Sequence, residues 1–353
     1  ILKEMKILSV GPLKGRSNTC THRHWALYKI ANYIDSVSTN EKKISLWYRF
    51  AYHLFLYGIP LRVPENNGEN QRIKKLIDEN QYDVVWIDKG ITIFPETLKY
   101  IKQVQPDCRI VSYSPDNMAL RHNQSQQYLE CIPLYDYIVT NKSYILDDMK
   151  KLGARNIQFV NNSFEPSFHY PRELSEEDKK RIGGDVGFVG MWEKERCESI
   201  LYLTDHGIKV RVFGDKKWKK YQNYNSNLTI EVGGLFSDDY AKSFQAFKIS
   251  LCFLRKMNFD QQTTRSVEIP ACGGFMLAER TNEHMQLFKE GKEAEYFSSN
   301  EELLEKCRYY LDHEDERLEI AKKGLERCIN SNYSNEGVIQ NVLKLIFQHD
   351  IKK

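Results

Sequence analysis

The chain has 353 residues, more than one hydrophobic core ordinarily supports, so its length predicts two domains. Its 51 basic and 48 acidic residues nearly cancel, and a net charge of +3 argues against a surface built mainly to bind nucleic acid. Eight scattered cysteines without a CxxC pair argue against a structural zinc site and indicate a reducing, cytoplasmic compartment.

The first half alternates between apolar runs of strand length and helical segments. Strands are predicted at 6–10, 83–87, 109–113, 136–140 and 157–161. Helices are predicted near 23–34 and 98–103. Because strands that alternate with helices build parallel sheets with right-handed crossovers, this half is predicted to be a doubly wound α/β domain.

One segment of the first half, residues 44–60, is crowded with aromatic side chains. It is shorter than the ~20 apolar residues that a membrane-spanning helix needs, and Arg49 and His53 interrupt it. We expect a helix packed into the core of the first domain. The alternative is an interfacial helix that contacts a membrane or an acceptor.

Residues 166–184 break the alternation with two prolines, a run of charges and a glycine pair, and they predict a linker. The pattern then restarts, with strands predicted at 186–189, 209–213, 228–232, 249–253 and 275–278. The expected organisation is two Rossmann-like domains that face each other across a cleft, made of residues 1–165 and 185–335. Residues 336–353 are expected to form a helix that returns to the first domain. Such sheets bind ligands beyond the carboxyl ends of their strands.

The segment 258–279 (NFDQQTTRSVEIPACGGFMLAE) is the most informative in the chain. Thr263 or Thr264 can cap a short helix, and Arg265 stands in its first turn. A helix N-terminus together with a guanidinium group suits a diphosphate. Glu268 lies three residues after Arg265, on the same helical face, where it can accept both hydroxyls of a ribose. The alternative is a plain Arg265–Glu268 salt bridge on a solvated face.

This segment resembles the donor-binding signature of GT-B glycosyltransferases, in which two acidic residues are spaced as E-x7-E before an A-C-G turn. Here the spacing is Asp260-x7-Glu268, followed by Ala271-Cys272-Gly273. The match is nearest to the bacterial CgeB-like group; it covers the last half of the chain well and the first half loosely. Asp260 stands where many relatives have Glu, which leaves its contact with the sugar open.

A more distant similarity, to phage DNA β-glucosyltransferase, implies roles for individual residues. In that enzyme an R-x2-E pair holds the diphosphate and the ribose, which matches Arg265 and Glu268. The loop 190–196 (GMWEKER) is similar to its phosphate loop and implies that Gly190, Arg196 and Lys194 contact the donor. Gly214 is a further donor-side candidate, with the nucleotide base near 213–214 and 233–236. The alternative is that Arg196 is simple surface charge and that both glycines merely end strands.

The first domain offers candidates for the acceptor side. An inverting transferase needs a general base, and Asp116, just after a predicted strand, is the best candidate, although it could instead form an Asx turn or a helix cap. Asp88 and Lys89 follow another strand, and the triplet Asp88-Lys89-Gly90 resembles the CgeB-like group. His22 and Arg23 follow the first strand's loop and could also face the cleft.

The sequence therefore predicts a hexosyltransferase-type enzyme that moves a sugar from a nucleoside diphosphate, UDP-linked, to a hydroxyl acceptor in surface glycan or glycoconjugate synthesis. The acceptor is a glycan, a lipid-linked molecule or a nucleic acid. No Asp-x-Asp motif occurs in a strand-end context, so neither a metal nor another cofactor is implied. The expected location is cytoplasmic, with contact to the inner face of the membrane through residues 44–60. The alternatives are a phage-type DNA-base glycosyltransferase, a sugar-nucleotide epimerase and a non-catalytic nucleotide-sugar-binding scaffold.

Overall fold

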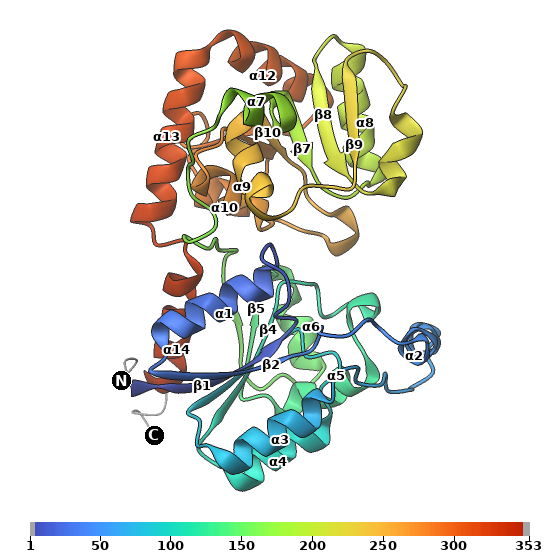
Figure 1. The fold of residues 1–353 in the computed structure, drawn as a ribbon, viewed down its shortest axis with the longest axis vertical. Helices are drawn as coiled ribbons and strands as arrows, with labels where there is room; N and C mark the ends of the chain where they lie inside the picture. Colours follow the sequence, from blue (N-terminus) through green and yellow to red (C-terminus); the bar gives the residue numbers. More distant parts are fainter. Residues whose placement is uncertain (1–3, 349–353) are drawn as a thin grey trace. The chain divides into compact units, whose positions relative to one another are not determined.

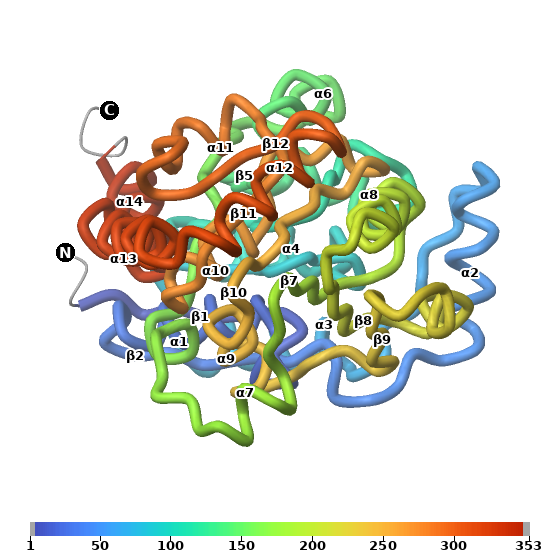
Figure 2. The backbone as a smooth tube through the Cα atoms, turned by 90° about the horizontal axis from the view of Figure 1, so that it is seen from above, coloured from blue at the N-terminus to red at the C-terminus, as the bar shows by residue number. Residues whose placement is uncertain are grey.

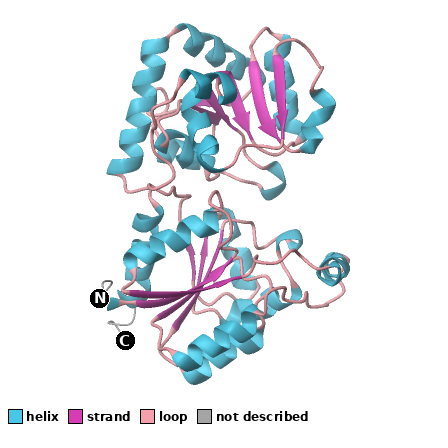
Figure 3. Ribbon diagram, viewed as in Figure 1, coloured by secondary structure: helices cyan, strands magenta, loops and turns pink. Residues whose placement is uncertain are grey.

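The computed structural model describes residues 4–348 in two compact units, drawn in Figure 1. The first unit combines Ile1–Asn161 with Asn335–Lys353, and the second is Asn162–Ser334. Residues 349–353, which end the expected terminal helix, lie outside the described residues, as do residues 1–3. In both units helices cover the two faces of a sheet (Figure 3).

The first unit is built on a six-stranded parallel sheet with the order β2-β1-β3-β4-β5-β6. The strands are β1 (Lys6–Gly11), β2 (Tyr33–Ser38), β3 (Val84–Asp88), β4 (Arg109–Ser114), β5 (Tyr137–Thr140) and β6 (Ile157–Phe159). The helices are α1 (Thr19–Ile30), α2 (Leu46–Leu56), α3 (Glu69–Glu79), α4 (Pro95–Val104), α5 (Gln126–Cys131), α6 (Leu146–Lys151) and α14 (Asn335–Gln348). Side chains alternate across a strand, so successive strand residues pack into the hydrophobic cores on opposite faces of the sheet. Val84 packs with α1 and α14, whereas Val85 packs with α3, α4 and α5.

Helix α2 does not join either core, so the favoured expectation for residues 44–60 is wrong. Only Ala51 and Phe55 of this helix are buried. Figure 1 and Figure 2 both show α2 at the edge of the first unit, away from its sheet. The segment is apolar enough for a core, but its outward face lies in solvent.

The second unit has its own six-stranded parallel sheet, with the order β12-β11-β10-β7-β8-β9. The strands are β7 (Gly184–Val189), β8 (Val210–Gly214), β9 (Leu228–Val232), β10 (Phe247–Cys252), β11 (Met276–Glu279) and β12 (Glu295–Phe297). The helices are α7 (Glu176–Ile182), α8 (Lys194–Asp205), α9 (Ser237–Ala246), α10 (Arg265–Ala271), α11 (Asn282–Leu287), α12 (Asn300–Asp312) and α13 (Glu314–Asn330). The α/β class with two Rossmann-like sheets is therefore confirmed.

Residues 166–184, expected as a linker, lie within the second unit and include α7. Ser175 begins α7 with a capping box, in which its side chain and that of Asp178 each accept a backbone N–H from the other residue. Asp178 also pairs with Lys242 of α9 at 3.1 Å. The charge run that indicated a linker is thus the solvated face of a short packed helix.

Candidate functional site

The strand order locates the place where a ligand is expected in the second unit. In chain order its strands run 3-2-1-4-5-6 across the sheet, so the connections leaving β7 and β10 run to opposite sides. Doubly wound sheets bind ligands beyond the carboxyl ends of the strands at this switch point. The candidates Gly190, Lys194 and Arg196 follow β7, and Asp260, Thr264, Arg265 and Glu268 follow β10. The donor-side residues predicted from sequence are therefore gathered around one position in the fold.

Three arginines converge at this switch point, and one of them, Arg255, was missed by the sequence analysis. Arg196 is 8% exposed; its Nη1 donates to the carbonyl of Met191 at 3.1 Å. Glu193 Oε1 lies 3.1 Å from Arg255 Nε and 3.7 Å from Arg196 Nη2. Burial lowers the pKa of Arg196; Glu193 opposes this effect, and Arg265 and Arg255 lower the pKa further. Glu193 is thus shared by two of the three arginines.

Some buried N–H groups of these arginines have no hydrogen-bond partner in the described part of the chain. Within residues 4–348, the Nε atoms of Arg196 and Arg265 are buried without a hydrogen-bond partner. Leaving a buried charged donor unsatisfied costs free energy, and an anion at the site would remove that cost. The reading of Arg196 as simple surface charge does not fit its burial.

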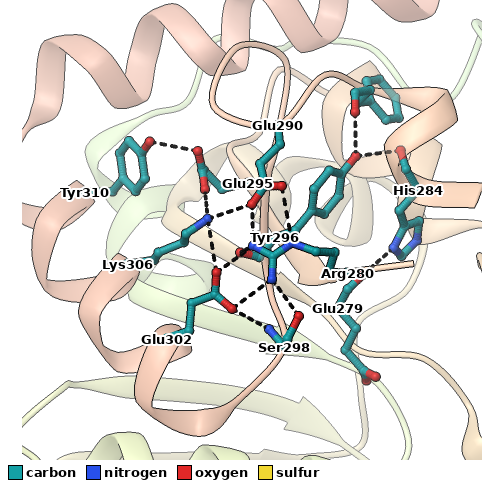
Figure 4. Close-up of polar contacts among 11 residues, drawn as sticks. Glu279, Arg280, His284, Glu290, Glu295, Tyr296, Ser298, Glu302, Lys306 and Tyr310 are labelled. Carbon is teal, nitrogen blue, oxygen red and sulfur yellow. Dashed lines mark hydrogen bonds and ion pairs between the residues drawn. The ribbon is translucent and has the colours of Figure 1, made fainter. Parts of the chain in front are cut away.

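Arg280, in the same unit, is an arginine whose charge is paired with carboxylates of the protein. Arg280 follows β11, and it donates to Glu302 at 2.9 Å and 2.5 Å and also to Glu290 (Figure 4). Lys306 joins the same network through Glu290 at 3.0 Å. The bond from Arg280 lowers the pKa of Glu302 to about 2. These charges are matched by one another and tie β11 to α12, unlike those of the switch-point arginines.

Glu268 lies in a buried polar cluster rather than on a solvated face, because only 3% of it is exposed. Its Oε2 accepts a hydrogen bond of 2.6 Å from the hydroxyl of Tyr240, and its Oε1 lies 3.5 Å from His169 Nε2. The Arg265 guanidinium lies 6.0 Å from the centre of the Tyr240 ring. The surface salt-bridge reading of Arg265 and Glu268 therefore fails.

The expected threonine cap of α10 is wrong. Thr264 precedes the helix without a side-chain cap. Instead the hydroxyl of Ser266 accepts the backbone N–H of Thr263 at 3.0 Å and lies 2.7 Å from His284 Nε2. Asp260 is half-buried in the preceding loop, where its backbone N–H donates to the carbonyl of Arg255. Thr264 thus stands at the switch point without closing the helix end.

The glycines and the lysine after the strands have different surroundings. A Cβ on Gly214 would lie 2.2 Å from Trp218, and one on Gly190 would lie 2.6 Å from Phe188. Trp218 Nε1 also donates to the Gly190 carbonyl at 3.1 Å. Protein atoms therefore fill the space beside both glycines, which favours their reading as strand-end glycines. Lys194 is exposed and lies 3.8 Å from Glu198, in solvent.

In the first unit, Asp88 and Arg23 form a buried pair. Arg23 donates to both carboxylate oxygens of Asp88, and the shortest N–O distance is 2.7 Å. The two side chains are 3% and 4% exposed, and the Arg23 guanidinium lies 4.2 Å above the Tyr113 ring. A Cβ on Gly11 would lie 2.8 Å from the Asp88 Cβ. This packing gives the pair a part in joining α1 to β3. His22 Nε2 lies 2.7 Å from the carbonyl of Arg16, within the loop after β1.

Lys89 and Asp116 are more open to solvent. Their side chains are 39% and 32% exposed, and Lys89 Nζ lies 3.2 Å from Asp116 Oδ2. Burial alone would lower the pKa of Lys89, but Asp116 and Cys20 raise it above its ordinary value, so the amine stays protonated. The nearby turn is closed by Asn117, whose Oδ1 accepts the Ala119 N–H at 3.2 Å. A carboxylate and a cation thus meet beyond the ends of β3 and β4.

Residues 4–348 contain no group of three or more His, Cys, Asp or Glu side chains placed to hold a metal ion. Among the same residues, none of the helices has the length and apolar character required to cross a membrane. All eight cysteines are buried and reduced.

Comparison with known proteins finds one family model, which covers most of the second unit and part of α14. Residues 196–344 match the model of a family described as glycosyl transferase-like. The match begins at Arg196 and includes Arg265 and Glu268. No curated protein sequence matches the chain.

Solved structures resemble the whole chain at low sequence identity. HepE from Anabaena, solved in complex with UDP-glucose, has a TM-score of 0.64 and 14% identity, covering 98% of this chain and 100% of that one. Sucrose-phosphate synthase from Thermosynechococcus elongatus has a TM-score of 0.67 and 9% identity, covering 99% and 100%. A putative UDP-N-acetylglucosamine 2-epimerase from Listeria monocytogenes has a TM-score of 0.57 and 9% identity, covering 99% and 98%. These likenesses confirm the GT-B fold. The family match supports a glycosyltransferase, as the sequence predicts.

Proposed function

We propose that this chain transfers a hexose-type sugar from a UDP-linked donor to a hydroxyl acceptor in glycan or glycoconjugate synthesis. The observation that carries the proposal is the arginine cluster at the switch point of the second unit. Arg196 and Arg265 hold buried donors without partners, and a diphosphate would supply the missing acceptors. Uracil as the base is supported by HepE, whose solved complex contains UDP-glucose.

The positions of the groups support individual roles. Arg196 and Arg265 bind the diphosphate, and Arg255 adds a third positive charge when its ion pair with Glu193 is broken. Glu268, held by Tyr240, accepts the ribose hydroxyls. The arginines stabilise the leaving diphosphate by preorganised charge, so the proposed reaction requires no metal or other cofactor. Arg265 and Glu268 are also residues through which the chain resembles the CgeB-like group, and together with Arg196 they carry the more distant similarity to phage DNA β-glucosyltransferase.

Asp116 is the proposed general base toward the acceptor hydroxyl. Its carboxylate is open to solvent and lies beside a protonated lysine at the carboxyl ends of the strands. Lys89 fixes the position of the carboxylate through their ion pair. The Asp116 side chain is 32% exposed, which leaves room for an incoming hydroxyl.

The first prediction separates donor binding from fold stability. Arg265→Met should lower UDP affinity about 10- to 100-fold, since charge-assisted hydrogen bonds contribute about 1.5–3 kcal/mol each. Without nucleotide the variant should melt at or above the wild-type temperature, because it removes a buried donor that has no partner. Titration calorimetry and thermal melts with UDP, GDP, ADP, CMP and dTDP measure both effects. Arg308→Met, an exposed arginine of α12, is the matched control.

Turnover assays extend the same experiment. Asp116→Asn should retain wild-type UDP affinity and lose kcat, whereas Arg265→Met should lose affinity first. Unchanged UDP binding in Arg265→Met would contradict the donor assignment. Nucleotide binding without turnover would favour the scaffold, and a C2 epimer as the product would favour an epimerase. Salt-sensitive binding of DNA would favour the nucleic-acid acceptor.

A further inference from the structure

The outward face of α2 is an unpartnered apolar surface in the first unit. Leu46, Trp47 and Phe50 of α2 are 82%, 56% and 52% exposed, and Tyr57, the C-cap residue that follows the helix, is 75% exposed. At 100° per residue Leu46, Trp47 and Phe50 fall on one side of the helix. The Trp47 and Phe50 ring centres lie 5.4 Å apart, so the aromatic side chains form a continuous patch.

The opposite face of α2 packs against the first unit. This packing sets the direction in which the apolar patch faces. Ala51 and Phe55 are fully buried, and the hydroxyl of Tyr52 donates to the carbonyl of His122. Arg121 donates from Nε to the Phe55 carbonyl at 2.6 Å, and its guanidinium lies 4.1 Å above the Phe55 ring. The exposed aromatics are therefore held outward by a packed helix rather than by a loose segment.

The charged side chains of the segment that carries the patch are of one sign. No aspartate or glutamate occurs between Glu41 and Glu65, whereas Lys42, Lys43 and Arg49 are present and exposed. Aromatic and leucine side chains beside exposed cations match the boundary between the headgroups and acyl chains of an anionic bilayer. A symmetric contact with a second copy would bring the same cations together, which disfavours it.

We infer that α2 docks the protein onto an anionic lipid surface. The helix lies in the interface with Leu46, Trp47, Phe50 and Tyr57 inserted, while Lys42, Lys43 and Arg49 contact the headgroups. Eleven residues are enough for such a helix and too few to span a bilayer. The inference does not depend on the donor site, because α2 belongs to the first unit and the switch-point arginines belong to the second.

Sedimentation of the full chain with lipid vesicles tests the inference. Vesicles of phosphatidylcholine with 30% phosphatidylglycerol should pellet the wild-type protein, and pure phosphatidylcholine should pellet at least tenfold less. Trp47→Glu combined with Phe50→Glu should reduce binding to anionic vesicles at least tenfold. The melting temperature should not change, since both side chains are exposed. Leu318→Glu with Ile329→Glu, two exposed apolar positions of α13, is the matched control and should bind like wild type.

Three results would overturn the inference. One is the absence of binding to anionic vesicles, and another is equal binding by the α2 double variant. The third is a wild-type dimer in light scattering that the double variant dissociates while vesicle binding stays unchanged, which would assign the patch to a second copy.

Discussion

At the scale of single residues, His169 shows how burial sets the charge of the cluster around Glu268. Its Nδ1 accepts the backbone N–H of Glu165 at 3.0 Å, so the proton of the neutral ring sits on Nε2. That nitrogen lies 3.5 Å from Glu268 Oε1. The neutral imidazole thus presents its N–H side to the carboxylate proposed to bind ribose.

The pKa of His169 leads to a prediction about acid stability. Burial lowers this pKa from 6.5 to about 3; Glu165 raises it and Arg172 lowers it further. Between these values the unfolded chain binds a proton that the folded chain does not. The contribution of His169 to stability is therefore complete above pH 6.5 and is lost as the pH falls toward 3. His169→Asn, which keeps an acceptor for Glu165, should reduce the loss of unfolding free energy between pH 7 and pH 5 by about 2 kcal/mol.

Urea unfolding at the two pH values measures this difference. His313→Asn, at an exposed histidine of the same unit, should retain the wild-type pH dependence. An identical loss in His169→Asn and wild type would show that the buried ring does not carry the effect. A larger loss would mean that the ring is charged in the folded protein.

The sequence could locate Arg265 and Glu268 because a short helix with a helical spacing is a local pattern. It could not locate their partners. Tyr240 comes from α9, and His169 comes from the segment expected as a linker. Arg255 looks like an ordinary loop charge until β10 is placed beside β7. Packing across the sheet decides which residues from distant segments come into contact. The spacing of residues along the sequence does not contain this information.

At the scale of elements, the contact between Gly214 and Trp218 fixes the end of β8. Trp218 is fully buried, and a Cβ at Gly214 would lie 2.2 Å from its ring and 2.8 Å from the Gly190 carbonyl oxygen. Gly214→Ala should therefore lower the free energy of unfolding by about 1–3 kcal/mol through overpacking.

Thermal or urea unfolding of Gly214→Ala checks this expectation against Gly184→Ala. A Cβ at Gly184 has no neighbour closer than 3.8 Å, so that variant should stay within about 0.5 kcal/mol of wild type. If Gly214→Ala kept full stability but lost UDP binding, the glycine would serve a ligand instead of the tryptophan.

Hydrophobic pattern explains which elements the sequence could predict. Buried central strands such as β3 are continuous apolar runs and were found. The edge strands β2 and β12 were missed; β2 reads YIDSVS and buries only Val37. For α2 the pattern indicated an apolar helix but could not tell whether its apolar face meets a core or solvent, since both surroundings select the same side chains.

At the scale of the whole molecule, alternation of strands and helices was sufficient to predict two doubly wound sheets. It did not predict strand order. The first sheet has its β1 and β3 strands adjacent, and the second has β7 and β10 adjacent, so each unit has one switch point. Asp88 ends β3 and Lys89 follows it at the first, and the arginines flank the second. The positions of the candidate residues therefore follow from topology that only the structure supplies.

The chain leaves the first unit after Asn161 and re-enters it at Asn335, so a core assembled from the first half is completed by the last helix. Leu343 of α14 is fully buried in the cluster that includes Ile7 and Leu27, whereas Leu345 of the same helix is 38% exposed. Leu343→Ala should lower the free energy of unfolding by about 2–5 kcal/mol, and Leu345→Ala by less than about 1 kcal/mol.

Amide hydrogen exchange shows which strands lose stability in the variant. In Leu343→Ala, exchange should accelerate in β1 and β3, whose side chains contact α14, more than in β7 and β10. Leu345→Ala should leave both pairs of strands at wild-type rates. Equal acceleration of the two pairs would mean that the units open together, and no acceleration in β1 would show that the first unit keeps its core without α14. The position of the acceleration thus decides whether the last helix is an integral part of the first unit.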